Sequence, residues 1–249
     1  MTFKDHFSAQ AADYARYRPH YPAELFRWLA EAAPGRALAW DCATGNGQVA
    51  SGLALHFSEV LATDASAEQL RQAPALPGVS YRVEPAEQSS LGDASADLLT
   101  VAQALHWFDL DGFYREARRV LRPNGLIAAW CYSLLSCEAK IDALVVRYYR
   151  DVVGPYWTAD RKKVEAGYRD IPFPFDPVAP PGLALHADWD LERFLGYLGT
   201  WSASQRYRTA RGADPLAAIA ADMEAAWGSP DLKRHIEWPL HFRVGRCEK

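Results

Sequence analysis

The chain has 249 residues, with 27 Lys and Arg against 31 Asp and Glu, which gives a formal net charge of −4 at pH 7. This length is enough for one sizeable hydrophobic core, and we expect a single domain over 1–249. The acidic balance gives no overall attraction to a polyanion, which argues against nucleic acid as a substrate. No apolar run is long enough to span a bilayer, and the charged first residues lack a signal-peptide core. We therefore expect a cytoplasmic protein that does not bind membranes.

The four cysteines, Cys42, Cys131, Cys137 and Cys247, form no C-x-x-C pair and have no neighbouring histidine at a zinc-binding spacing. We interpret them as buried or neutral free thiols in a reducing compartment. No metal site is expected.

Residues 1–35 combine a run of aromatic and basic residues with a predicted helix. The run ends in Arg18-Pro-His-Tyr-Pro22, and the helix is expected to start at Ala23 and to bury Phe26 and Leu29. One interpretation of the aromatic residues is a staple that docks this helix on a sheet, with the arginines facing water.

The stretch 36–56 predicts a strand, a glycine turn and a helix. Ala37–Trp40 reads as a short buried strand, the loop Asp41–Gly47 follows, and Gln48–His56 carries apolar residues at helical spacing. Glycines in the loop let backbone approach a ligand closely, and the start of the helix offers unpaired N–H groups. This arrangement is typical of a nucleotide-binding site.

Two kinds of nucleotide fit this loop. Gly45–Ala50 matches the dinucleotide pattern G-x-G-x-x-G/A, and Asp64 lies near the offset of a ribose-binding acid. However, Asp41 at the end of the strand would place a carboxylate close to a pyrophosphate, and like charges repel in a partly buried site. A carboxylate favours S-adenosylmethionine, which carries a positive sulfonium and an ammonium group. An NAD-dependent oxidoreductase remains the alternative.

Strands and helices continue to alternate as far as residue 132. The predicted strands are Glu59–Asp64, Val79–Glu84, Ala96–Ala102 and Leu126–Trp130. Pro-Asn-Gly at 123–125 predicts a turn before the last of these, with Gly125 accepting a positive φ. The alternation predicts a parallel, doubly wound α/β sheet.

In this order, the motifs resemble those of the class I S-adenosylmethionine-dependent methyltransferases, in the small-molecule branch of the trans-aconitate and ubiquinone-biosynthesis enzymes. The resemblance implies a Rossmann-like sheet of seven strands, the last antiparallel, in three α/β/α layers. It implies that Asp64 binds the ribose, that Ala86 and Glu87 lie near the adenine and that Gln103 lies near the methionine part. The full set of cofactor-binding residues that it implies is Asp41, Ala43, Thr44, Gly45, Asn46, Gly47, Asp64, Ala65, Ala86, Glu87 and Gln103. Ala43 replaces the family's first loop glycine.

The resemblance also divides the chain into four functional parts. Residues 1–35 would form a lid over the cofactor and the first helix, and 36–132 the cofactor-binding core. Residues 133–204 would be a substrate-side insertion that includes the sixth strand at Leu183–Trp189, and 205–249 would supply a C-terminal helix and the last strand. The proline-rich stretch at 171–177 is not a central strand, because prolines lack a ladder donor.

His106 is the candidate catalytic residue, because it follows the fourth strand at the edge where such sheets bind ligands. It would act as a base or as a hydrogen-bond donor to an anionic acceptor, or it would simply orient its loop. The expected acceptor pocket consists of Tyr14, Arg18, Tyr21, Trp107 and Trp201.

These residues predict a small-molecule acceptor, with an organic acid carboxylate first and a quinone-like or aromatic metabolite second. A cofactor-binding module without turnover is a further alternative. The oligomeric state is not encoded in any of these patterns.

Overall fold

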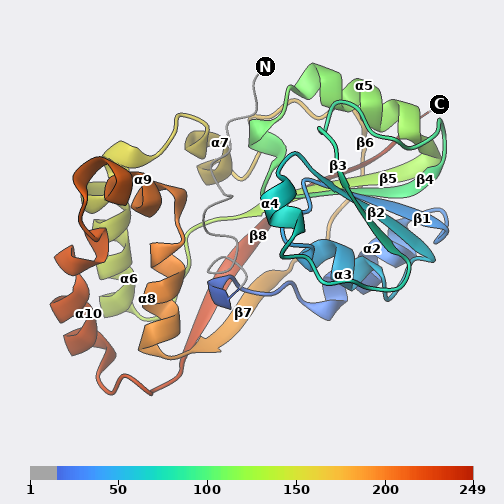
Figure 1. The fold of residues 1–249 in the computed structure, drawn as a ribbon. Helices are drawn as coiled ribbons and strands as arrows, with labels where there is room; N and C mark the ends of the chain where they lie inside the picture. The colour runs from blue at the N-terminus through green and yellow to red at the C-terminus, as the bar shows by residue number, and fades with distance from the viewer. Residues whose placement is uncertain (1–15, 249) are drawn as a thin grey trace.

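A computed structural model describes residues 16–248, and its centre is one mixed β-sheet (Figure 1). The strands follow the order β3-β2-β1-β4-β5-β8-β6, and β7 pairs with β8. β1 to β5 are parallel, and β8 is antiparallel to β5. The strands are β1 (Leu38–Cys42), β2 (Glu59–Asp64), β3 (Val79–Val83), β4 (Ala96–Ala102), β5 (Leu121–Tyr132), β6 (Asp176–Pro177), β7 (Ala184–Trp189) and β8 (Arg234–Arg246).

This arrangement confirms the predicted doubly wound fold with an antiparallel last strand. The sheet has eight strands where seven were expected, because the proline-rich stretch contributes the two-residue β6. β6 lies at the edge of the sheet, where a missing N–H donor is tolerated.

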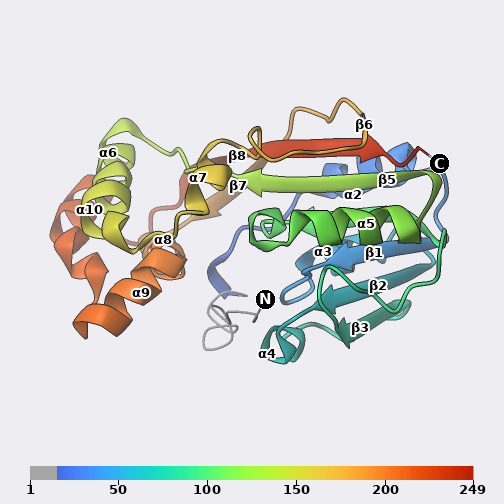
Figure 2. The same cartoon turned by 90° about the horizontal axis from the view of Figure 1, so that it is seen from above.

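Alternate residues of each central strand face opposite layers. Ala39 and Leu98 belong to one apolar cluster, whereas Trp40 and Leu99 belong to the other. The first cluster includes residues of α2 and α3, and the second includes residues of α5, so helices cover both faces (Figure 2). These helices are α2 (Ala23–Ala32), α3 (Gln48–Leu53) and α5 (Leu110–Val120). The predicted three layers are confirmed.

The chain after β5 builds a second group of helices beyond the carboxyl ends of the parallel strands, and β7 and β8 extend toward it (Figures 1 and 2). Its α-helices are α6 (Ala139–Arg147), α8 (Leu191–Gly199), α9 (Ser202–Arg211) and α10 (Ala220–Trp227). Short elements complete the chain: α4 (Ala67–Leu70), α7 (Arg161–Glu165), η2 (Leu105–Trp107), η3 (Tyr148–Val152), η4 (Gly154–Tyr156) and η5 (Pro215–Ala218). Within 16–248, none of the helices has the length and apolar character needed to cross a bilayer.

Two local expectations were wrong. One C-terminal helix was expected within 205–249, but this part of the chain holds most of α9 and then η5 and α10, which are separated at Ile219, where φ is −127°. In the turn at 123–125 the positive φ falls on Asn124, at 63°, and not on Gly125. The Asn124 N–H donates to the carbonyl of Cys247, which holds the turn in this form, and asparagine tolerates the left-handed region better than most residues.

All four cysteines are free, as predicted, and three of them are buried. Burial raises the pKa of Cys131 to about 12, so this thiol is neutral at physiological pH.

Asp97 in β4 joins three strands through one buried carboxylate. Its Oδ2 accepts the backbone N–H groups of Ala37 (2.8 Å) and Leu38 (3.1 Å), and its Oδ1 pairs with Arg122 at 2.7 Å. The side chain of Asp97 is fully buried. Removing it leaves three donors without their acceptor, two of them backbone N–H groups at the start of β1, which is costly.

We predict that Asp97→Ala lowers the free energy of unfolding by about 2–4 kcal/mol. Asp93→Ala is the control, because Asp93 also pairs with an arginine but its side chain is 80% exposed; the control should cost less than about 1 kcal/mol. Urea denaturation measures both variants, and equal losses would contradict the role assigned to Asp97.

Candidate active site

The loop after β1 has an unusual backbone. Ala43, Gly45 and Gly47 all have positive φ, at 56°, 58° and 81°. Glycine adopts this conformation freely, whereas a residue with a Cβ pays roughly 1–2 kcal/mol. The loop therefore needs glycine character at all three positions, and Ala43 keeps the turn at a cost in strain.

Asp41 lies beneath this loop at the end of β1, and its side chain is fully buried. Its Oδ2 accepts the hydroxyl of Thr44 at 2.5 Å, and its Oδ1 accepts the hydroxyl of Thr100 at 2.9 Å. Burial raises the pKa of this carboxyl to about 7, although the two hydroxyls and the backbone of Ala50 oppose the rise. Asp41 thus sits behind the loop and holds it by hydrogen bonds.

Asp64 braces the same loop from β2. Its two carboxylate oxygens accept the backbone N–H groups of Gly45 (2.9 Å) and Ser66 (2.8 Å). Ala65 follows directly and is half-buried, and Asn46 within the loop is buried. The predicted loop residues and the acid of the second strand are therefore brought together.

Tyr81 on β3 reaches this loop and was not predicted. A Cβ built on Gly47 would lie 2.8 Å from the Tyr81 hydroxyl, so only glycine allows this approach. The hydroxyl is buried and has no hydrogen-bond partner within residues 16–248. A tyrosine in the middle of a strand carries no sequence signal that distinguishes it from an ordinary β-strand residue.

Ala86 and Glu87 lie further along the same edge. Ala86 is buried in the α5-side cluster. The Glu87 carboxylate accepts the N–H of Asp109 at 3.1 Å and lies close to Gly112, so it braces the start of α5.

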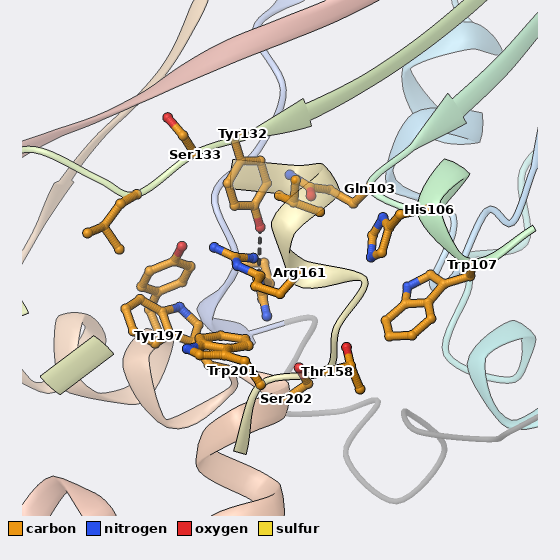
Figure 3. Close-up of a pocket in the computed structure, with 14 residues that line it drawn as sticks. Gln103, His106, Trp107, Tyr132, Ser133, Thr158, Arg161, Tyr197, Trp201 and Ser202 are labelled. Carbon is orange, nitrogen blue, oxygen red and sulfur yellow. Dashed lines mark hydrogen bonds between the residues drawn. The ribbon is translucent and has the colours of Figure 1, made fainter. Parts of the chain in front are cut away.

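A cavity opens beside this edge, between the carboxyl ends of β4 and β5 and the second group of helices (Figure 3). The cavity is open to solvent, and it measures about 720 Å³ when this open part is counted. Its lining residues are Arg18, Gln103, His106, Trp107, Tyr132, Ser133, Leu134, Trp157, Thr158, Arg161, Val164, Tyr197, Trp201 and Ser202.

Five predicted site residues line this cavity, namely Arg18, Gln103, His106, Trp107 and Trp201. The two other residues predicted for the acceptor pocket are Tyr14 and Tyr21. Tyr21 is not among the lining residues and packs edge-on against Trp130, at 5.6 Å between ring centroids. Tyr14 lies outside the described residues.

Gln103 is the predicted cofactor residue that lines the cavity. Its backbone has φ 59°, and its N–H donates to the carbonyl of Trp130 at 2.8 Å. The side-chain Nε2 is buried and has no partner within the described part of the chain. A buried amide nitrogen without an acceptor is costly, so a ligand acceptor is the natural partner here.

His106 is held by Tyr168, whose hydroxyl lies 2.9 Å from Nδ1. Burial, and to a smaller extent the positive charge of Arg161, lowers the pKa of His106 to about 3. The ring is therefore neutral at physiological pH. The contact with Tyr168 fixes the orientation of the imidazole ring beside the cavity.

The lining residues that sequence reasoning missed come mainly from 133–204. Arg161, Trp157 and Tyr197 are brought to the cavity by the chain that crosses from the sheet to the helices and back (Figure 3). No local pattern marks them. They share only the aromatic and basic character that also occurs in buried cores and at surfaces.

The chain matches known methyltransferases along its whole length. The methyltransferase-domain family matches residues 40–129. A Dictyostelium discoideum protein named as a methyltransferase is 33% identical over 99% of this chain and 96% of its own length. A solved type II methyltransferase from Anaeromyxobacter dehalogenans is 47% identical, with a TM-score of 0.87 over 93% of this chain and 99% of that one.

This chain is a class I S-adenosylmethionine-dependent methyltransferase. An uncharacterized methyltransferase of Mycobacterium tuberculosis is 38% identical over 48% of this chain and 49% of that protein. The family assignment removes the dinucleotide-dependent alternative. It agrees with the buried acid at the end of β1, which disfavours a pyrophosphate.

The methyltransferase's loop fits the methyl donor of its class. The space above Gly45 is open, because a Cβ built there would meet nothing closer than 3.9 Å. Two acids lie beneath and beside the loop, and the unpartnered amide of Gln103 points away from the protein's own acceptors. These groups suit a ligand that is cationic and rich in hydrogen-bonding atoms.

We predict that the affinity for S-adenosylmethionine rises several-fold from pH 5.5 to pH 7.5. Across this range Asp41, whose pKa is about 7, becomes ionised and attracts the cationic sulfur. Asp41→Asn should flatten this rise in isothermal titration. S-adenosylhomocysteine, which lacks the charge on sulfur, should show a shallower rise with the wild-type protein.

The raised pKa of Asp41 also determines whether the stability of the protein rises or falls with pH. Its pKa in the folded state lies above the ordinary 3.8, so the folded protein binds more protons between about pH 4 and pH 7. Stability without ligand should therefore fall as pH rises through this window, and fall less in Asp41→Asn. Identical pH profiles for the two proteins would contradict the assignment.

Proposed function

We propose that this methyltransferase binds S-adenosylmethionine at the 41–47 loop and transfers its methyl group to a small molecule in the adjoining cavity. The observation that carries the proposal is Gln103, which follows β4 beside the loop and also lines the cavity with an unpartnered amide. The cytoplasmic location stays a prediction.

The loop residues would hold the donor by backbone and charge. Ala43 to Gly47 would approach it closely, and Asp64, which already accepts the N–H groups of Gly45 and Ser66, would also accept the ribose hydroxyls. Ala65, Ala86 and Glu87 would line the adenine side. Asp41 would act from below, through Thr44 and through its charge.

S-adenosylmethionine supplies a methyl group on a positively charged sulfur, which is already a good leaving group. The protein therefore has mainly to position the acceptor, and positioning alone can supply up to about 7–11 kcal/mol in favourable cases. His106 would contribute as a neutral hydrogen-bonding group, because a pKa of about 3 leaves it a poor base at neutral pH.

The acceptor class follows from the character of the cavity. Among the described residues that line it, none is Asp, Glu or Lys, so no carboxylate or amine is available as a base. An organic acid is the first candidate, because a carboxylate is already deprotonated at neutral pH. An aromatic or quinone-like acceptor is the second, and the walls of Trp107, Trp157 and Trp201 favour it.

We predict that Asp64→Ala weakens S-adenosylmethionine binding by about 10- to 100-fold, because hydrogen bonds to a charged acceptor are worth roughly 1.5–3 kcal/mol each. Glu59→Ala is the matched control, since Glu59 is an exposed acid at the other end of the same strand. Isothermal titration measures the affinity of both variants for S-adenosylmethionine. Equal affinities for Asp64→Ala and wild type would contradict the assignment of Asp64 to the cofactor pocket.

Turnover is tested with radiolabelled S-adenosylmethionine and a panel of organic acids, phenols and quinols. Label transfer to at least one small acceptor is expected. Tight binding of the donor together with no transfer across the panel would favour a binding module without turnover.

A further inference from the structure

Arg161 is the one strongly basic side chain that the insertion 133–204 contributes to the cavity lining. It begins the short helix α7, and its side chain lies in the centre of the cavity among aromatic rings (Figure 3). Arg161 is half-buried, so its charge is only partly screened by water.

Neighbouring side chains hold the guanidinium of Arg161, by a hydrogen bond at its Nε edge and by aromatic rings against its plane. Its Nε donates to the Tyr149 hydroxyl at 2.7 Å, and its carbon lies 4.6 Å from the ring centroid of Trp157 and 5.3 Å from that of Tyr149. Stacking of this kind is typical of arginines that recognise planar anions, because it sets the plane of the fork in advance.

The nearby acids are already engaged. The Tyr149 hydroxyl donates to Glu165, and Asp160 pairs with Lys163 at 2.9 Å. Within residues 16–248, Arg161 itself makes no ion pair, and no hydrogen bond from its Nη1 or Nη2 is formed with another described residue. The outer edge of the fork therefore remains for a partner that enters the cavity.

Arg18, the other arginine of the cavity, is used differently. Its Nη1 donates to the Tyr132 hydroxyl at 2.7 Å, and its Nη2 donates to the carbonyl of Thr200 at 3.2 Å. These bonds join the end of β5 to the end of α8. Arg18 thus supports the cavity wall, whereas Arg161 presents hydrogen-bond donors to the space inside.

We propose that Arg161 is the specificity-determining residue of the acceptor site and that it selects acceptors bearing a carboxylate, which its Nη1 and Nη2 bind bidentately. This proposal rests on the cavity being the acceptor site of the methyltransferase. A planar carboxylate matches the fork, and the stacked Trp157 and Tyr149 cover part of the guanidinium.

The chemistry balances without a base when the acceptor is such an acid. A carboxylate oxygen forms a bond to the methyl carbon as the carbon–sulfur bond breaks, and the electron pair of that bond stays on sulfur. No proton has to leave the acceptor, in agreement with a cavity whose histidine is neutral and whose lining, among residues 16–248, includes no acid. In an acceptor with two carboxylates, Arg161 would hold one while the other reacts.

The experiment compares carboxylates with their uncharged primary amides, using cinnamate, phenylacetate and sorbate as probes. Binding to the full-length protein is measured by isothermal titration, with and without saturating S-adenosylhomocysteine. We expect at least one carboxylate to bind at least tenfold more tightly than its amide. Arg161→Gln should remove this preference, and Arg161→Lys should restore part of it, because lysine keeps the charge but lacks the fork.

Lys162→Gln is the matched control. Lys162 is an exposed cation on the same helix, and its substitution removes the same charge from a residue that does not line the cavity. It should bind the carboxylates as the wild type does. Equal losses in Arg161→Gln and Lys162→Gln, equal binding of acids and amides, or no carboxylate binding at millimolar concentration would each overturn the proposal.

The two proposals fail in distinguishable ways. If the proposed function is wrong, the wild type and all of its variants will fail to bind S-adenosylmethionine. The role of Arg161 is still decided in that case by the acid–amide comparison without cofactor. If the donor binds with unchanged affinity in Arg161→Gln, any lost acid binding belongs to the acceptor site alone.

Discussion

The site depends on one buried carboxylate at the end of β1. Asp41 has no exposed surface, and its charge is offset only by hydroxyl and backbone donors, so its pKa lies near 7. An acid in this position destabilises the protein without ligand as it ionises. The cost is consistent with a site that meets a cationic ligand, since a positive sulfur favours the ionised form. The hydrogen bond from the Thr44 hydroxyl connects this carboxylate to a loop in which three residues have positive φ.

Charge is separated across the site in a way that suits both reactants. Asp41 and Asp64 brace the loop side, whereas Arg18 and Arg161 lie on the cavity side. A cationic donor and an anionic acceptor would each meet the opposite sign, and Gln103 stands at the junction. Between them His106 remains neutral, because burial and the nearby guanidinium both disfavour its proton. In the proposed mechanism, positioning by hydrogen-bond donors would therefore take the place of a general base.

Sequence reasoning succeeded where the signal is local and periodic. β2 and β4 begin and end where predicted, and the loop residues 41–47 meet Asp64 because parallel strands bring their carboxyl ends to one edge. It failed where the contact is long-range. Arg161 reaches the cavity from a segment with no repeating pattern, and Tyr81 resembles any strand residue. The positive φ at Asn124 depends on a bond to Cys247, more than a hundred residues away, which no turn rule contains.

The cavity exists only because two separately encoded parts of the chain meet. The segment that follows β4 supplies Gln103 and His106, while the chain after β5 supplies Trp157, Arg161 and Trp201. Arg18 joins these halves by donating to Tyr132 on β5 and to the carbonyl of Thr200 beyond α8. Cofactor-side residues can therefore stay constant while the insertion changes the acceptor. On this view the loop after β1 sets the reaction, and the α7 segment sets what is methylated.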